Sequence, residues 1–194
     1  MLEIRLTGRG GQGTMVAAKI LAVAAAREGL HVQAFPEFGV ERRGASVCAY
    51  VRIARQPIYE RGRILRPGHL MVLDPVLLDR PDLAQNVGAG GWIVMNTRLA
   101  PEAWRARFDG FKAAAIDANA LAIEHRLGSR FAPFVNSVML GAFVRAVPFV
   151  ACDTLCAAIR ENSPAKPDAN VAAALQAYRD VRLAAAAEAV WATR

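Results

Sequence analysis

Cysteine is scarce in this chain of 194 residues, which contains only Cys48, Cys152 and Cys156. Three thiols are too few for a disulfide framework. Cys152 and Cys156 stand one helical turn apart, with no second cysteine or histidine pair beside them, so a four-ligand zinc or iron–sulfur site is not supported. The three histidines are scattered along the chain. We therefore expect the thiols to act as small buried apolar side chains, and we expect no metal site.

A long apolar run is also missing. The longest uncharged stretch in the apolar middle of the chain is Phe131–Val144, which has 14 residues and contains a proline, an asparagine and a glycine. It is too short to span a membrane. The sequence begins with a strand pattern rather than a secretory signal, so we expect a cytoplasmic protein. The length suits one domain, residues 1–194, with a full hydrophobic core.

Lysine is rare, because only 3 of the 24 basic residues are lysine, and the net charge is +7. Between Glu37 and Arg66 the arginines outnumber the acidic residues by seven to three. No helix-turn-helix, zinc knuckle or aromatic RNA-binding pattern accompanies them, so we expect no nucleic acid. An acidic protein or a polyphosphate is the better match for this charge. The seven arginines are Arg42, Arg43, Arg52, Arg55, Arg61, Arg63 and Arg66.

The first 29 residues predict a strand, a glycine turn and a helix. Leu2–Leu6 alternates apolar and polar residues, and the helix pattern that follows ends at Glu28–Gly29. The N–H groups at the start of such a helix form an anion site. The candidate binding residues of the turn are Gly8, Arg9, Gly10, Gly11, Gln12, Gly13 and Thr14.

Three interpretations of the turn remain open. The spacing of Gly8, Gly10 and Gly13 satisfies the dinucleotide fingerprint, and Glu37, after a second strand at His31–Phe35, is a candidate for its acidic residue. Alternatively, the backbone amides hold a phosphate or a partner's group, or the glycines serve only strand–helix packing. The charged loop 36–44, which leads into a strand at Ala45–Ile53, is either a functional loop or a solvated connection.

The remaining pattern predicts an α/β domain with a Rossmann-like layered fold, in which helices flank a mostly parallel central sheet. His69–Asp74 and the segment 90–97 form continuous apolar strands typical of a sheet that is covered on both faces. Lys112–Asp117 predicts a weaker strand and the segment 119–127 a helix. Asn136 or Ser137 is expected to cap a buried helix in which Gly141 permits close approach of another element. A long C-terminal helix is expected from about Lys166 to Trp191, beginning with proline and aspartate.

Two motifs carry a resemblance to a known family. The glycine turn, followed by Pro36-Glu37-Phe38-Gly39-Val40-Glu41-Arg42-Arg43-Gly44-Ala45, resembles the gamma subunit of 2-oxoacid:acceptor oxidoreductases. These are the pyruvate/ketoisovalerate ferredoxin oxidoreductases and their relatives, including phenylglyoxylate dehydrogenase-type enzymes. The resemblance continues through Asn136 and covers nearly the whole chain. Many members have Arg-Gly-Gly where this chain has Arg43-Gly44-Ala45, which resembles the pyruvate-type branch more than the indolepyruvate type.

The resemblance implies a subunit of an enzyme that oxidatively decarboxylates a 2-oxo acid to an acyl-CoA. In the family, thiamine diphosphate lies between the alpha and beta subunits, and iron–sulfur clusters in the beta and delta subunits pass electrons to ferredoxin or to NAD through an NAD-reducing subunit. This chain has neither a thiamine diphosphate motif nor a set of cysteines for a cluster. The resemblance therefore implies no catalytic residue here, no cofactor held by this chain alone, and an inactive isolated chain. The 2-oxo acid, the acceptor and the stoichiometry stay open.

The resemblance also implies that the gamma subunit packs on the catalytic subunits and helps to form the CoA-side approach. Our hypothesis places Arg42 and Arg43 at the interface or the CoA entrance, with Glu37 and Glu41 as pairing partners. The alternative is that these charges only shape their own loop. A stand-alone NAD(P)-binding oxidoreductase and a pure scaffold subunit are the rival functions. The expected interface or CoA-entrance residues are Glu37, Phe38, Glu41, Arg42, Arg43, Gly44 and Asn136.

Overall fold

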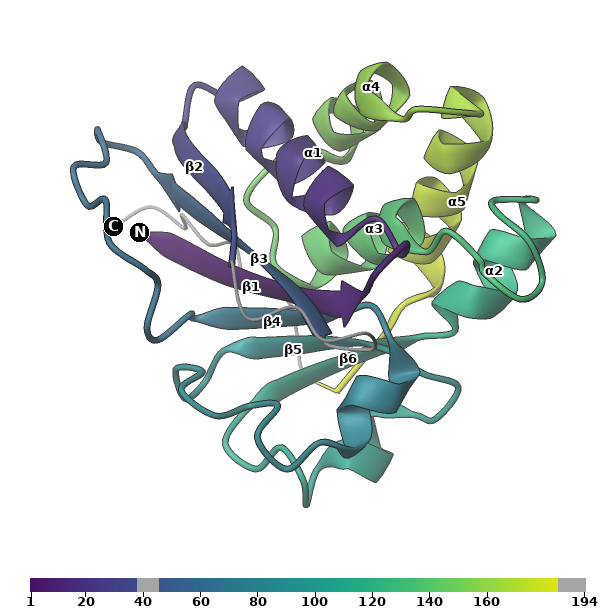
Figure 1. Cartoon of the computed structure of the whole chain (residues 1–194), viewed down its shortest axis with the longest axis horizontal. Helices are drawn as coiled ribbons and strands as arrows, with labels where there is room; N and C mark the ends of the chain where they lie inside the picture. Colours follow the sequence, from purple (N-terminus) through teal and green to yellow (C-terminus); the bar gives the residue numbers. More distant parts are fainter. Residues whose placement is uncertain (38–45, 185–194) are drawn as a thin grey trace.

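The chain folds around a central sheet against which the helices are layered (Figure 1). This computed structural model describes residues 1–37 and 46–184. Its strands are β1 (Leu2–Arg9), β2 (His31–Pro36), β3 (Ser46–Ala54), β4 (His69–Val72), β5 (Trp92–Asn96), β6 (Lys112–Ile116) and β7 (Arg182–Leu183). Its helices are α1 (Thr14–Arg27), α2 (Ala118–Glu124), α3 (Asn136–Ala146), α4 (Cys152–Asn162) and α5 (Pro167–Asp180), with short 3-10 helices η1 (Pro75–Asp79) and η2 (Pro101–Trp104).

The strands of the described residues lie in the order β2-β3-β1-β4-β5-β6-β7. β1, β4, β5 and β6 pair in parallel. β3 pairs antiparallel with both β1 and β2, so β2 again runs in the direction of β1. β7 pairs antiparallel with β6 at the far edge. The predicted mostly parallel α/β fold is confirmed, and β3 and β7 are the strands of opposite direction.

Apart from His69 and Asn96 at their ends, β4 and β5 are apolar because both of their faces are covered. Met71 of β4 and Val94 of β5 are fully buried in the cluster that contains the helices. Leu70, Val72 and Ile93 point to the other face, where they form a second cluster with residues of η1 and of the loops around η2. Two-sided burial explains why β4 and β5 have no polar–apolar alternation.

All five described α-helices contribute buried side chains to the larger cluster, on one face of the sheet (Figure 1). α3 lies in the middle of this layer and crosses α5 closely. A Cβ atom at Gly141 of α3 would stand 2.0 Å from the carbonyl oxygen of Ala174 in α5. The predicted role of Gly141 in permitting a close approach is therefore confirmed. No helix of the described residues combines the length and the apolar character that a membrane span requires.

The C-terminal helix is shorter than predicted. α5 begins at Pro167 as expected but ends at Asp180, so the extension toward Trp191 is wrong at least through residue 184. Val181 adopts an extended conformation, and Leu183 then pairs with Ala114 of β6. The helix does not continue as the local sequence pattern predicts, because the next two residues, Arg182 and Leu183, pair with β6 at the edge of the sheet.

Candidate functional site

The glycine turn joins β1 to α1 at the carboxyl edge of the parallel strands. Gly11 and Gly13 have φ angles of 89° and 80°, a left-handed conformation that glycine adopts without strain. Gly10 and Gly11 are exposed, and a Cβ atom on either would meet no described atom within 4 Å. The middle of the turn is therefore open to a ligand, and two of its residues need glycine for conformational reasons alone.

The two ends of the turn are crowded. A Cβ atom at Gly8 would stand 2.6 Å from Thr14 Oγ1 and 3.2 Å from the Cβ atom of Leu73, just after β4. One at Gly13 would stand 2.9 Å from Nδ2 of Asn136, the first residue of α3. These glycines let the ends of β1 and β4 and the starts of α1 and α3 meet at one place.

A buried carboxylate, that of Asp74, forms hydrogen bonds with two side chains of the turn. Asp74 directly follows Leu73 at the end of β4 and is fully buried. Its Oδ2 accepts hydrogen bonds from Gln12 Nε2 at 2.7 Å and from Arg9 Nε, and its Oδ1 accepts one from the Val76 amide at 2.9 Å. Since the Arg9 side chain is 53% exposed, its guanidinium still presents positive charge to solvent beside the turn.

The start of α1 retains the donors that an anion would use. Its N-cap is Gly13, no side chain among the described residues caps it, and its first turn has no acidic residue. The leading N–H groups of an uncapped helix lack intrahelical partners, and the helix dipole favours negative charge there. The Thr14 hydroxyl is buried and has no hydrogen-bond partner among the described residues. Open amides, an unused hydroxyl and the Arg9 cation together fit a phosphate group.

The charged segment after β2 begins and ends at this same edge. Glu37 follows β2, and Ser46 at the start of β3 pairs with Arg9. The intervening residues, among them Phe38, Glu41, Arg42, Arg43 and Gly44, lie outside the described residues. Glu37 itself accepts hydrogen bonds from the Tyr50 hydroxyl at 3.0 Å and from Arg63 at 2.6 Å. Burial, together with this bond to Glu37, raises the pKa of Tyr50 to about 12.

The topology separates Glu37 from the glycine turn, whereas the dinucleotide interpretation requires this carboxylate to lie close to the turn. In that fingerprint the acidic residue ends a strand directly beside β1 and contacts the ribose. Here β3 lies between β1 and β2. With about 4.8 Å between neighbouring strands, β2 is roughly 10 Å from β1. Glu37 is also engaged by Tyr50 and Arg63, so the geometry does not reproduce the fingerprint.

Asn136, which the sequence predicts as an interface or CoA-entrance residue, lies beside Gly13 of the turn, and its expected capping role is wrong. The N-cap of α3 is Val135, and no described side chain caps the helix. Ser137 instead donates from its hydroxyl to Oδ1 of Asn170 in α5, at 2.7 Å within the core. Asn136 faces Gly13, so it fixes how closely α1 and α3 approach each other.

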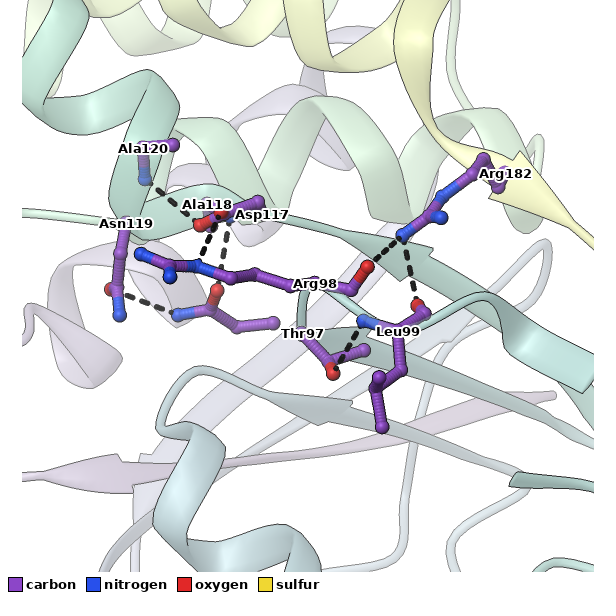
Figure 2. A network of polar contacts seen from close by, with 9 residues as sticks. Thr97, Arg98, Leu99, Asp117, Ala118, Asn119, Ala120 and Arg182 are labelled. Atoms are coloured by element: carbon purple, nitrogen blue, oxygen red, sulfur yellow. Dashed lines mark hydrogen bonds and ion pairs between the residues drawn. The ribbon is translucent and has the colours of Figure 1, made fainter. Parts of the chain in front are cut away.

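The same edge continues into a network at the end of β5 (Figure 2). The buried Asn96 donates from Nδ2 to the Leu73 carbonyl at 2.8 Å and to Asn119 Oδ1 at 3.1 Å. Its Oδ1 accepts from the Ala118 amide at 3.0 Å. One amide side chain thereby ties the ends of β4 and β5 to the start of α2.

Asp117 and Arg182 extend this network toward the far edge of the sheet (Figure 2). Asp117 caps α2 through the Ala120 amide at 2.9 Å and pairs with Arg98 at 3.0 Å. Arg182 donates to the carbonyls of Arg98 and Leu99. These polar groups bond one another, and we assign them a structural role.

Two titratable groups, His69 and Cys156, have a structural role. His69 Nδ1 accepts a hydrogen bond from the Trp92 amide at 3.0 Å, and burial, with Lys112 nearby, lowers its pKa to about 4. Burial raises the pKa of Cys156 to about 11, so this thiol stays protonated. Within the described ranges, no three histidine, cysteine, aspartate or glutamate residues gather into a possible metal site.

Sequence reasoning missed Asp74 as a residue of the site. It was recognised only as the end of a buried strand. A carboxylate directly after an all-apolar strand is a usable signal, because in parallel sheets ligands bind outside the carboxyl ends of the strands. Its hydrogen bonds to Arg9 and Gln12 join residues more than sixty positions apart, and the sequence pattern does not display them.

Comparison with known proteins agrees with this architecture. The model of the family described as pyruvate ferredoxin/flavodoxin oxidoreductase matches residues 3–180. Pyruvate synthase subunit PorC of Methanothermobacter marburgensis is 43% identical over 94% of this chain and 98% of its own length. The pyruvate/ketoisovalerate oxidoreductases common subunit gamma of Thermococcus kodakarensis is 42% identical over 92% of this chain and 96% of its own.

A solved structure shares the fold. The crystal structure of pyruvate oxidoreductase subunit PORC from Thermotoga maritima superposes with a TM-score of 0.80 at 30% identity. The superposition covers 95% of this chain and 98% of that one. The likeness therefore extends over nearly the whole chain.

Proposed function

Because the chain belongs to the pyruvate ferredoxin/flavodoxin oxidoreductase family, we propose that it holds a phosphate of CoA at its glycine turn, as the gamma subunit of a multi-subunit 2-oxoacid oxidoreductase. The reaction converts a 2-oxo carboxylate and CoA into an acyl-CoA, CO2, two electrons and one proton. This subunit contributes binding and positioning, and the bond-breaking steps belong to its partner subunits.

The uncapped start of α1 is the observation that carries this proposal. The N–H groups after Gly13, the buried Thr14 hydroxyl without a partner, and the exposed guanidinium of Arg9 converge on one open turn. CoA carries phosphates, and such donors bind phosphate through directed hydrogen bonds and charge. The crowding at Gly8 and Gly13 keeps this geometry rigid.

The composition of this chain supports the placement of the redox cofactors in other subunits. We propose that thiamine diphosphate and the iron–sulfur clusters lie in alpha-, beta- and delta-type subunits, with ferredoxin or an NAD-reducing subunit as the acceptor. The sequence has only three cysteines, and the described residues contain no three-ligand group. Few, unpaired thiols also fit a cytoplasmic location.

The choice of 2-oxo acid belongs elsewhere in the complex. The Thermococcus relative is named as a gamma subunit common to pyruvate and ketoisovalerate oxidoreductases. One gamma subunit that serves two substrates supports a substrate pocket formed by the other subunits. Pyruvate, a branched-chain 2-oxo acid and phenylglyoxylate remain candidates for this chain's complex.

We further propose that Arg42 and Arg43 act at the subunit interface or at the CoA entrance. Their segment starts after Glu37 and ends at Ser46, which pairs with Arg9 beside the turn. This placement supports a shared site for the turn and the arginines. Replacing both arginines with alanine should weaken assembly or raise the apparent KM for CoA. Unchanged assembly together with unchanged CoA dependence would refute the assignment.

The test uses the intact complex, purified anaerobically through a tag on this chain. A Gly10→Leu variant fills the open side of the turn, where no described atom lies within 4 Å of the new Cβ. We expect the apparent KM for CoA to rise at least tenfold, with assembly unchanged. Pantetheine, which has the same thiol but no phosphate, should be used equally well by the variant and the wild type.

A matched control is Ala106→Leu, an equally bulky change at an exposed position after η2. It should leave both KM values unchanged. If Gly10→Leu leaves the KM for CoA unchanged, the turn does not hold a CoA phosphate and the scaffold function is favoured. If the tagged chain purifies alone with stoichiometric NAD, the stand-alone dehydrogenase is favoured.

A further inference from the structure

The loop between β3 and β4, Arg55–Gly68, lies away from the glycine turn. β3 runs antiparallel to β1, so its end at Ala54 stands beside the start of β1, where Ile53 pairs with Leu2. The glycine turn follows the other end of β1. Figure 1 shows the loop at the outer left of the view and the turn near the start of α1. The loop and the glycine turn therefore lie beyond opposite ends of β1, and Arg63 extends from the loop to Glu37 at the end of β2.

A buried arginine holds this loop in shape. Arg52 of β3 is only 3% exposed, and its guanidinium donates to the carbonyls of Glu60 at 3.1 Å and Gly62 at 3.3 Å. Its charge is compensated by Glu3 at 2.9 Å, and Gln33 also accepts from it. Removing a guanidinium from water costs free energy, and the loop carbonyls that accept hydrogen bonds from Arg52 compensate part of that cost. The buried arginine therefore maintains this conformation of the loop.

Two further features attach the loop to the rest of the domain. Ile64 is 4% exposed, and Arg63 reaches back to Glu37 at 2.6 Å. A loop with this many attachments is preorganised, and binding a partner then carries a smaller entropy loss.

The outer side of the loop combines exposed apolar groups with positive charge. Tyr59 is 83% exposed and Leu65 is 75% exposed. Arg61 and Arg66 are also exposed and form no ion pair among the described residues. Across Arg55–Gly68 there are four arginines and one glutamate. Tyrosine and arginine are, with tryptophan, enriched among the residues that carry most of the binding energy at protein interfaces.

We propose that this loop is a docking surface for a carboxylate-rich surface on another subunit of the same oxidoreductase. Arg61 and Arg66 pair with its carboxylates, while Tyr59 and Leu65 supply the apolar contact. The inference rests on the proposed gamma-subunit function for the identity of the complex. It assigns a contact that is independent of the CoA phosphate site.

The scarcity of lysine makes a clean test possible, since the chain has only three lysines. An Arg61→Lys, Arg66→Lys variant keeps the charge and adds two amines that a carbodiimide couples to contacting carboxylates. In the tagged native complex we expect zero-length crosslinks from these positions to aspartate or glutamate of another subunit. The control variant, Arg105→Lys with Arg107→Lys, changes two exposed arginines near η2 and should give no such crosslink.

Charge reversal gives the second measurement. Arg61→Glu with Arg66→Glu should raise the dissociation constant of this subunit from the complex at least tenfold at 0.15 M salt, with unchanged CD spectra. The same reversal at Arg105 and Arg107 should have little effect. An intact complex with neither crosslinks nor weakened assembly refutes the docking surface and leaves the proposed function standing.

Two other outcomes are informative. Loss of co-purifying nucleic acid on charge reversal, without any subunit crosslink, overturns the protein partner. A tagged wild-type chain that purifies alone overturns both this inference and the proposed function.

Discussion

The glycine turn allows a graded test in which three alanine substitutions lie within four residues of one another. Gly10→Ala introduces neither left-handed strain nor a contact, because its φ is not positive and no described atom is near. Gly11→Ala introduces strain alone, at φ 89°. Gly13→Ala introduces strain at φ 80° and a contact of 2.9 Å with Asn136 Nδ2. The structure therefore predicts a rank order.

The magnitudes follow from two separable terms. A non-glycine residue in the left-handed region loses roughly 1–2 kcal/mol. Overpacking adds about 1–3 kcal/mol. We expect the free energy of unfolding to fall by about 1–2 kcal/mol for Gly11→Ala and by about 2–5 kcal/mol for Gly13→Ala. For Gly10→Ala it should be unchanged or rise by up to about 1 kcal/mol, because alanine restricts the unfolded chain.

Equilibrium unfolding of the full chain in urea, followed by far-UV circular dichroism, measures these values. A double-mutant cycle with Asn136→Ala isolates the contact, since shortening Asn136 removes the Nδ2 and Cγ atoms that the new methyl group would meet. In that background the penalty of Gly13→Ala should approach that of Gly11→Ala. Equal effects at Gly10 and Gly13, or a cycle with no coupling, would refute the packing described here.

Three other predictions concern stability. The pKa of His69 is about 4 in the folded protein against 6.5 for an ordinary histidine, so folding favours the neutral form of its side chain. The free energy of unfolding should therefore be highest above pH 6.5 and fall by about 3 kcal/mol as the pH drops to 4. Urea titrations should show a flatter pH profile for His69→Asn. Gly141→Ala places a methyl group 2.0 Å from the Ala174 carbonyl, so α3 and α5 must separate, and calorimetry should show a lower Tm and a loss of roughly 1–3 kcal/mol or more. Asp74→Ala removes the acceptor for the side chains of Arg9 and Gln12, which should lower stability by about 1–3 kcal/mol and speed amide exchange in the turn; unchanged exchange would contradict the role of these hydrogen bonds.

Local sequence patterns were sufficient where one strong local cause decides the structure. The four glycines at positions 8, 10, 11 and 13 predicted the turn, and the apolar runs of β4 and β5 predicted burial on both faces of the sheet. The glycine at position 141 predicted the close approach of another element, which is α5. Each of these is a property of a few adjacent residues, which a single sequence displays.

Long-range choices were not visible in the sequence. Nothing local shows that β3 inserts between β1 and β2 and so moves Glu37 away from the turn. The pairing of Glu37 with Arg63 depends on how the 55–68 loop folds back. The helix pattern after Asp180 yields to a strand because β6 has an open edge to fill, which is a property of the finished sheet.

The position of β1 in the middle of the sheet determines when this strand can pair during synthesis of the chain. β1 leaves the ribosome before both of its neighbours in the sheet, because β3 ends at Ala54 and β4 at Val72. At about 5–20 residues per second, β1 waits several seconds until β4 has been synthesised. β1 is thus exposed in the nascent chain before either of its neighbours is available for pairing. Conditions that slow elongation should therefore favour aggregation of this subunit before its partner subunits ever meet it.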